Sequence, residues 1–311
     1  MGVVLAALVP VFLLIVLGFA LRQSLMRLET QWHGLERLVY YVLLPALLID
    51  TLTRADLATV PVLGVGGALM LSALLLSLLC LALRPLLAAK CAIDGSAFTS
   101  IFQGATRWQT YVALAVAGNL YGDLGLALAS VAMVAIIPLV NVLSVAVLAH
   151  YASPERPSAR AIAMTVVRNP LIWACAVGLA VNVLQIPVPR MLHEVAEALG
   201  RSSLAIGLLV TGAGLHLEGL FRRSAAAALA VFLKLILMPA VAVGLALLFG
   251  LSGTNLAVVV CCTAVPTSSS GYVLARQMGG DAPLLAQIIT LQTIFAAITM
   301  PVVIALAATG P

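Results

Sequence analysis

Residues 100–111 read SIFQGATRWQTY and residues 262–272 read CTAVPTSSSGY. Each stretch places polar side chains, together with glycine or proline, in the middle of a long apolar run. Pro266 lacks an amide hydrogen, and Gly104 and Gly271 weaken a helix, so each stretch predicts a break. Unwound backbone at membrane depth is tolerated only where it is buried or lines a wet cavity. The two stretches therefore predict a polar site deep in a membrane protein; the alternative is two kinks whose hydroxyls bond their own backbone.

The composition around these stretches is that of a chain dissolved in a bilayer. Of 311 residues, 63% are apolar and 9% charged, and the mean hydropathy is +1.17. A soluble protein of this length needs far more polar surface. The net charge of +5 comes without a basic stripe, so nucleic acid is not an expected partner. The five cysteines form no CxxC pair and lie near no His cluster, so we expect neither a metal site nor a cofactor.

Apolar runs of spanning length predict an all-α membrane protein with ten transmembrane helices. The runs cover residues 3–21, 36–53, 61–83, 97–119, 124–149, 168–186, 197–217, 226–250, 254–277 and 284–308. No Lys or Arg precedes the first run, so we interpret it as a true span and not as a signal peptide.

The distribution of Lys and Arg predicts the orientation of these spans. With both termini outside, only Arg54, Arg190 and Arg201 fall in outer loops. The cytoplasmic loops then hold eleven positive residues: Arg22, Arg27, Arg37, Arg84, Lys90, Arg156, Arg160, Arg168, Arg222, Arg223 and Arg276. This bias predicts a multi-pass protein of the cell inner (plasma) membrane.

A shift of about 160 residues relates several landmarks of the two halves. It matches Pro10 to Pro170, Tyr111 to Tyr272 and, less closely, Pro138 to Pro301. Because each half has an odd number of spans, the second copy must enter the membrane the other way up. We therefore expect two inverted five-helix repeats, at residues 1–150 and 168–311, with broken, crossing helices four and nine. A cytoplasmic linker at residues 151–167 would join them.

Arg107 is the sharpest single candidate, because a guanidinium near the bilayer centre costs at least ~2.5–3.5 kcal/mol. With the positive ends of half-helices that start after each break, it would suit an anionic carboxylate. The alternative is that it binds backbone carbonyls freed by the break, or snorkels. The expected substrate site comprises Thr106, Arg107, Gln109, Thr110, Pro266, Thr267, Ser268, Ser269 and Ser270. Lys234, inside the eighth run, would either help to attract an anion or hold a kink.

Two absences narrow the function further. All eleven acidic residues fall in loops or near span ends, so no proton-relay carboxylate is expected at mid-membrane. Hydroxyls at Thr267 to Ser270 could still hold sodium, but transport driven by the substrate gradient and the membrane potential is the simpler hypothesis. No HExxH, GxSxG or phosphate-binding loop is present, so we do not expect an enzyme.

Seven short motifs, in order along almost the whole chain, resemble the auxin efflux carrier family, within the bile/arsenite/riboflavin transporter superfamily. They are PVFLLIVLG at residues 10–18, LLPALL at 43–48, YG at 121–122, PLVNVLS at 138–144, RNP at 168–170, KLILMP at 234–239 and YVLARQ at 272–277. Gln109, Ser269 and Ser270 depart from the family, whose members often carry asparagine near these places.

The resemblance implies ten helices with a crossed pair of broken ones, and a transport domain that moves against a scaffold like an elevator. It implies a carrier of small organic anions, such as malate, malonate or auxin-like acids. Because an inside-negative membrane potential favours the exit of an anion, export is the expected direction. The alternatives are a sodium-coupled symporter of the bile-acid type and a membrane sensor that binds without transport. A homodimer is left open as the oligomeric state.

Overall fold

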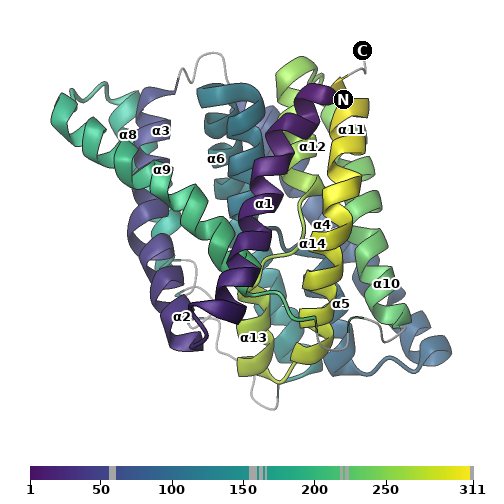
Figure 1. Cartoon of the computed structure of the whole chain (residues 1–311). Coiled ribbons are helices and arrows are strands. Elements are labelled where there is room, and N and C mark those ends of the chain that lie inside the picture. Colours follow the sequence, from purple (N-terminus) through teal and green to yellow (C-terminus); the bar gives the residue numbers. More distant parts are fainter. Residues whose placement is uncertain are drawn as a thin grey trace.

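The computed structural model describes residues 1–55, 61–153, 167–217 and 224–308, with the single residues 160, 164 and 220 between them. Every regular element in these residues is a helix, and the helices form one bundle (Figure 1). They are α1 (Gly2–Ser24), α2 (Glu29–Leu38), the π-helix η1 (Val39–Leu43), α3 (Leu44–Arg54), α4 (Val62–Cys91), α5 (Gly95–Thr106), α6 (Thr110–Tyr151), α8 (Pro170–Val183), α9 (Arg190–Ala213), α10 (Ala225–Phe232), the π-helix η2 (Leu233–Leu237), α11 (Met238–Leu248), α12 (Gly253–Ala264), α13 (Ser270–Met278) and α14 (Ala282–Ala308).

Six helical segments among the described residues are long and apolar enough to cross a membrane, which makes this a multi-pass membrane protein. They are Gly2–Ser24, Leu63–Cys91, Gly95–Tyr151, Arg190–Ala213, Ala225–Leu248 and Ala282–Ala307. The remaining expected spans do not stand as separate long helices. The second expected span includes the charged end of α2, and the sixth corresponds to the short helix α8. The ninth expected span is divided into α12 and α13. The fourth and fifth are joined within one segment.

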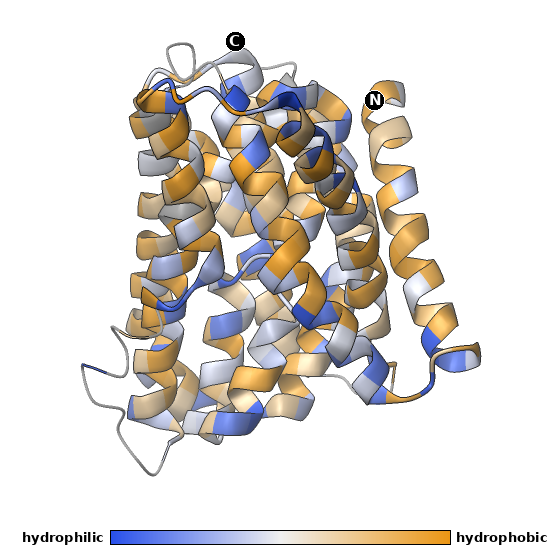
Figure 2. Cartoon of the chain, turned by 90° about the vertical axis from the view of Figure 1, so that its left-hand side faces the viewer, coloured by the Kyte–Doolittle hydropathy of each residue, from blue (hydrophilic) through white to orange (hydrophobic). Residues whose placement is uncertain are grey.

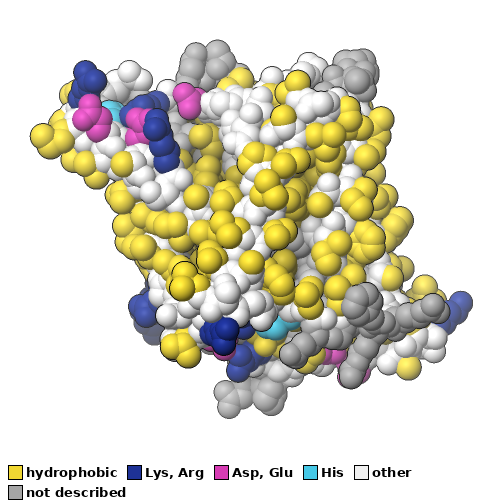
Figure 3. All heavy atoms as spheres, in the orientation of Figure 1, with side chains coloured by type: hydrophobic (Ala, Val, Ile, Leu, Met, Phe, Trp, Pro, Cys, Tyr) yellow, Lys and Arg dark blue, Asp and Glu magenta, His cyan; other side chains and the backbone are white. Residues whose placement is uncertain are grey.

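The surface of the bundle matches a bilayer environment. In Figure 3 hydrophobic side chains cover the middle of the visible face, and charged side chains gather toward its two ends. At one end Asp50, near the end of α3, pairs with Arg54 (3.2 Å) and with His193 of α9 (2.7 Å). These charged side chains therefore pair with one another at the end of the bundle. The predicted linker at residues 151–167 falls largely outside the described residues.

Both polar stretches break the helices that contain them. α5 ends at Thr106, Arg107 is extended (φ −72°, ψ 159°), and α6 begins at Thr110. α12 ends at Ala264, Val265 is extended (φ −71°, ψ 153°), and α13 begins at Ser270. Figure 1 shows both breaks near mid-height of the bundle, and Figure 2 shows hydrophilic unwound backbone at that level. The predicted interruption of the fourth and ninth runs is therefore confirmed.

α6 folds back on itself at Gly122. This glycine has φ 58° and ψ −142°, which side chains with a Cβ rarely adopt, and it joins two helices. A Cβ on Gly125 would lie 2.1 Å from the Ala117 carbonyl oxygen. Two residues eight apart in a straight helix would be about 12 Å apart along the axis. The close approach therefore shows a hairpin at Gly122, at the place where the sequence separates the fourth and fifth runs.

The helices pack in two groups. α1, α2, α3, α8 and α9 contact one another, with α1 against α9 and α3 against α8 as the most extensive pairs. α4, α5, α6 and α10 to α14 form the second group, and fewer contacts join the groups. In the first group α1 and α9 cross closely: a Cβ on Gly212 would lie 1.8 Å from the Ile15 carbonyl oxygen, and one on Gly18 would lie 2.0 Å from that of Leu209. Gly18 and Gly212 therefore allow the close approach of α1 and α9.

Candidate functional site

The two breaks meet and are tied together through their backbones. The Gln109 N–H donates to the Pro266 carbonyl (2.9 Å). The Thr267 hydroxyl lies within hydrogen-bond reach of three carbonyl oxygens, those of Gln103 (3.2 Å), Gly104 (2.8 Å) and Arg107 (3.1 Å). Because buried backbone groups need partners, these bonds stabilise unwound chain in the interior.

Gln292 of α14 completes this tie. Its side-chain oxygen accepts from the Thr267 N–H (2.8 Å), and its amide donates to the carbonyls of Gly104 (2.8 Å) and Ala230 (3.1 Å). One fully buried amide therefore joins α5, α10, α14 and the second break. Asn182 also links helices, because its side-chain amide donates to the carbonyls of Leu52, Thr53 and Ala55.

Arg107 is a buried cation with unpaired hydrogen-bond donors. The residue is 8% exposed, and its Nη2 donates to the Ser270 hydroxyl (2.9 Å). Nε and Nη1 are buried and have no hydrogen-bond partner among the described residues, and no carboxylate pairs with the guanidinium there. A guanidinium presents a planar fork of N–H groups that matches a carboxylate. Two donors of this buried guanidinium are therefore left without a partner among the described residues.

Gly271 allows Arg107 to lie where it does. A Cβ added at this position would meet Cδ of Arg107 at 3.2 Å and Nε at 3.4 Å. The same Cβ would lie 3.4 Å from Oε1 of Gln103, whose amide is also buried and unpaired among the described residues. Absence of a side chain at residue 271 is therefore what lets the guanidinium stem pass over the start of α13.

Two helix N-termini face the same place. α6 starts at Thr110 and α13 starts at Ser270, directly after each break. The first turns of a helix leave N–H groups unpaired and carry a partial positive charge. At the start of α13, the hydroxyls of Ser268 and Ser270 lie 2.9 Å apart. The guanidinium and the two N-termini together make this side of the crossing electropositive.

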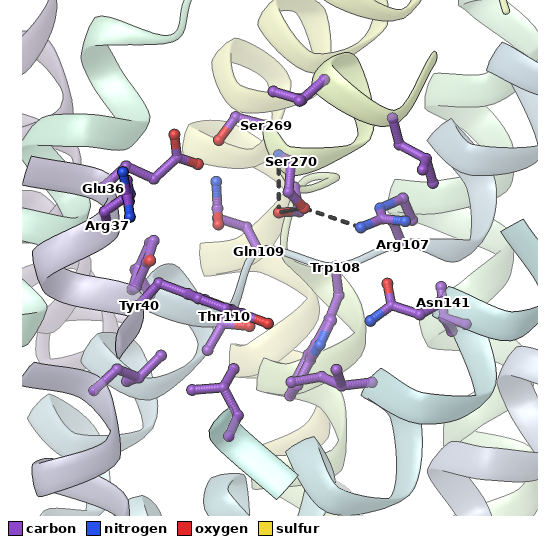
Figure 4. A pocket seen from close by; sticks show the side chains of 18 of the residues that line it. Glu36, Arg37, Tyr40, Arg107, Trp108, Gln109, Thr110, Asn141, Ser269 and Ser270 are labelled. Carbon is purple, nitrogen blue, oxygen red and sulfur yellow. Dashed lines mark hydrogen bonds between the residues drawn. The ribbon is translucent and has the colours of Figure 1, made fainter. Parts of the chain in front are cut away.

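A cavity of about 430 Å³ opens in front of these groups (Figure 4). One wall is the crossing and the adjoining parts of α6 and α13; the other is α2, η1 and the starts of α3 and α8. The lining residues are His33, Glu36, Arg37, Tyr40, Tyr41, Leu44, Arg107, Trp108, Gln109, Thr110, Tyr111, Ile137, Val140, Asn141, Val145, Leu171, Ser268, Ser269, Ser270, Val273, Leu274 and Gln277. The cavity therefore lies between the two helix groups, with a polar floor and largely apolar and aromatic walls.

The structure divides the nine predicted site residues into two sets. Six of them line the cavity: Arg107, Gln109, Thr110, Ser268, Ser269 and Ser270. The other three lie behind it. Thr106 bonds back to the Phe102 carbonyl (2.8 Å), Pro266 accepts from Gln109, and Thr267 holds the α5 carbonyls. These three shape the crossing and do not face the cavity.

The opposite wall was missed by the sequence reasoning. His33, Glu36, Arg37, Tyr40 and Tyr41 all line the cavity from α2 and η1. Their spacing of three, four, seven and eight residues marks a single helix face, which is a signal that the sequence does contain. Pro45 explains the local π-helix, because it cannot donate to the carbonyl four residues earlier, and the extra residue widens the turn.

The bundle has apolar flanks and two helix breaks at mid-height, with an electropositive cavity beside the breaks. This architecture is typical of a membrane transporter. The comparison with protein families agrees. Residues 155–304 match the family model described as "Membrane transport protein" (Mem_trans), and so carry the domain of the auxin efflux carrier family. The resemblance noted in the sequence is thereby confirmed. No curated protein matches the chain.

Proposed function

We propose that this protein is a secondary carrier of small organic anions, with the carboxylate held by Arg107. The observation that carries the proposal is the buried guanidinium with Nε and Nη1 unpaired among the described residues, facing a cavity of about 430 Å³. The N-termini of α6 and α13 add positive potential at the same place. The family domain at residues 155–304 supports transport over catalysis.

The proposed substrate is a carboxylate such as malate, malonate or an auxin-like acid. Arg107 and the hydroxyls of Ser268 to Ser270 supply the polar floor, and Gln109 supplies an amide whose Nε2 is buried and unpaired in the described part of the chain. Tyr40, Trp108 and Asn141 face the same space in Figure 4. A small anion with an apolar part fits these surroundings, because a site of few polar groups in an apolar pocket fixes orientation and adds burial energy.

The proposed architecture is ten spans in two inverted five-helix repeats, at residues 1–150 and 168–311, joined by a cytoplasmic linker. α5 with the start of α6, and α12 with α13, would be the crossing broken helices. The cavity lies between the two helix groups, and this supports an elevator in which α4, α5, α6 and α10 to α14 carry the substrate past the rest. The proposed location of the protein is the cell inner (plasma) membrane, with both termini outside.

Export is the proposed direction. Neither break carries a carboxylate that could serve as a proton relay, and Glu36 lines the cavity from the opposite wall, on α2. The substrate gradient and the membrane potential are therefore the proposed driving forces. For a monovalent anion leaving an inside-negative cell, the potential contributes about 2.3 kcal/mol per 100 mV. A homodimer is compatible with this mechanism, and each copy would contain its own complete cavity.

The decisive experiment is counterflow of carboxylates in proteoliposomes with the Arg107→Ala variant. Losing one partner of a buried charged pair costs about 2–5 kcal/mol, so uptake should fall about 30-fold or more. Arg107→Lys keeps the charge without the planar fork and should retain part of the activity. Arg27→Ala removes an exposed arginine outside the cavity and serves as the control. Unchanged counterflow by Arg107→Ala at equal protein density would remove this residue from the mechanism.

The same experiment separates the two alternatives. A sodium-coupled symporter of the bile-acid type would show counterflow only with sodium present. A membrane sensor would bind a carboxylate, measured by a shift in melting temperature, without any flux.

A further inference from the structure

The wall opposite the crossing carries an acidic side chain that anion binding by Arg107 does not use. Glu36 of α2 lines the cavity from that wall, while Arg107 lines it from the crossing. In Figure 4 the two side chains lie on opposite sides of the pocket, with Ser270 between them. The cavity therefore has a basic side and an acidic side.

Glu36 occupies a position on α2 where an apolar residue is usual. It lies four residues after Trp32 and three before Val39, and both of these side chains are buried. Positions at this spacing share one helix face, which a packed helix normally fills with apolar side chains. The Trp32 Nε1 donates to the Met26 carbonyl (2.6 Å), and this bond holds the start of α2 in place. A carboxylate in an inward-facing stripe is an informative exception, because acidic residues are mostly found on the surface.

The carboxylate of Glu36 is available to a ligand. Its side chain is 33% exposed and points into the cavity, in the direction of Ser269 and Gln109 on the opposite wall (Figure 4). Within the described part of the chain its one ionic partner is His33, whose Nδ1 lies 3.5 Å from Oε2. A carboxylate accepts hydrogen bonds through both oxygens and donates none when ionised. Glu36 therefore offers the cavity an acceptor with a negative charge.

The neighbouring Arg37 does not cancel this charge. Successive residues of a helix do not face each other, and no ion pair between Arg37 and Glu36 exists among the described residues. Arg37 also lines the cavity, but it is exposed, whereas Glu36 is half-buried. The more enclosed of the two charges on this wall is therefore the negative one.

We propose that Glu36 is a specificity-determining residue, which selects a monocarboxylate bearing a hydrogen-bond donor, such as a hydroxyl group, at the end away from its carboxylate. This inference rests on the proposed carrier function and narrows its substrate class. The substrate carboxylate binds Arg107, and the donor at the other end binds the Glu36 carboxylate. A hydrogen bond to a charged group is stronger than one between neutral groups.

The same residue rejects a second carboxylate. A dicarboxylate bound to Arg107 would direct its other negative charge toward Glu36, and like charges that face each other weaken binding. Selectivity then arises from an attractive contact to one class of acid and a repulsive contact to the other. Among small organic anions, hydroxy monocarboxylates are therefore the preferred substrates, and dicarboxylates such as malonate are poor ones.

The test compares acids of matched shape by counterflow in proteoliposomes that contain the full-length protein. The first set is phenylacetate with hydrogen, hydroxyl, methoxy or carboxylate at the para position, and the second is 3-hydroxypropionate against malonate. The wild-type protein should prefer the hydroxyl compound of each set by about three- to tenfold, since Glu36 is partly exposed and its bond is correspondingly weakened. Methoxy accepts but does not donate a hydrogen bond, so it should behave like the unsubstituted acid.

Glu36→Gln is the decisive variant, because it keeps the size of the side chain and removes the charge. The preference for the hydroxyl compounds should shrink, uptake of the dicarboxylates should rise several-fold, and uptake of phenylacetate should stay the same. Glu29→Gln is the matched control. Glu29 lies on the same helix and also pairs with His33 (3.5 Å), but it lines a smaller hollow of about 70 Å³ and not the cavity, so its substitution should leave the ranking of acids unchanged.

Two results would overturn the proposal: a wild-type protein without a preference for the hydroxyl compounds, or a Glu36→Gln variant with an unchanged ranking. If the wild-type protein prefers dicarboxylates and Arg37→Gln abolishes that preference, Arg37 and not Glu36 contacts the far end of the substrate. If Glu36→Gln does not fold, the wild-type ranking decides. Absence of counterflow for every acid would refute the carrier function instead, and the shifts in melting temperature that the same acids produce would then judge the role of Glu36.

Discussion

Thr267→Val is the change that most directly probes how the crossing is held together. The Thr267 hydroxyl is fully buried and reaches the carbonyls of Gln103, Gly104 and Arg107 at 2.8–3.2 Å. Valine has nearly the same shape, so the substitution removes the hydroxyl without leaving a large cavity. A hydroxyl has only one proton to donate, so the three short distances amount to about one full hydrogen bond.

The expected loss of stability follows from that count. One net hydrogen bond contributes about 1 kcal/mol, and a buried carbonyl left without a donor costs about 1–3 kcal/mol more. Gly104 keeps the Gln292 amide and Gln103 keeps the Arg107 N–H, so the carbonyl left unpaired is that of Arg107. We therefore expect the free energy of unfolding to fall by about 2–4 kcal/mol.

Thr263→Val is the matched control. Thr263 is equally buried, one turn earlier, but its hydroxyl bonds back to Val259 (2.9 Å) and Val260 (3.2 Å) in its own helix. Those carbonyls already belong to the helical hydrogen-bond pattern, so losing the hydroxyl should cost under about 1 kcal/mol. Thermal unfolding of both variants in nanodiscs would measure the difference, at about 2 °C or more for each kcal/mol. Equal melting temperatures for the two variants would refute the assignment of Thr267 as the tie between the breaks.

Two glycine substitutions test the close approaches. Gly212→Ala should lower the melting temperature by several degrees, because its Cβ would lie 1.8 Å from the Ile15 carbonyl oxygen and α1 would have to move away from α9. Gly244→Ala is the control and should have no such cost, because nothing lies within 4 Å of a Cβ at that position. Equal effects of the two substitutions would contradict the close crossing of α1 and α9. Gly271→Ala should leave the free energy of unfolding within about 1–2 kcal/mol of the wild type but weaken carboxylate counterflow several-fold, because its Cβ would press on Arg107 Cδ at 3.2 Å. Normal counterflow by Gly271→Ala would show that the exact position of the guanidinium does not matter for binding.

Much of the site was accessible from the sequence because it depends on local chemistry. Proline at 266 and the polar run around Arg107 interrupt a helix wherever they occur, and the structure breaks both helices there. Prediction failed for α2 and η1, whose residues form the opposite wall of the cavity. Glu36 and Arg37 look like ordinary charges at a span end, and only packing against the crossing brings them to the site. The sequence also did not show that Pro266 and Thr267 lie behind the cavity. The direction of a side chain after a helix break depends on the helix packed against it, which is again a matter of tertiary packing.

The sequence by itself determined a membrane protein with two interrupted polar helices, because apolar length and proline act through neighbours along the chain and through the surrounding bilayer. Only the tertiary structure decided which of those polar groups face one another. It paired the carbonyls at the end of α5 with Thr267 and Gln292, and it left those of Cys262 and Thr263 without their usual helical donors. Such hydrogen bonds join residues at least 25 positions apart in the sequence. Because a hydrogen bond acts only over about 3 Å, no local sequence pattern can specify which residues it joins.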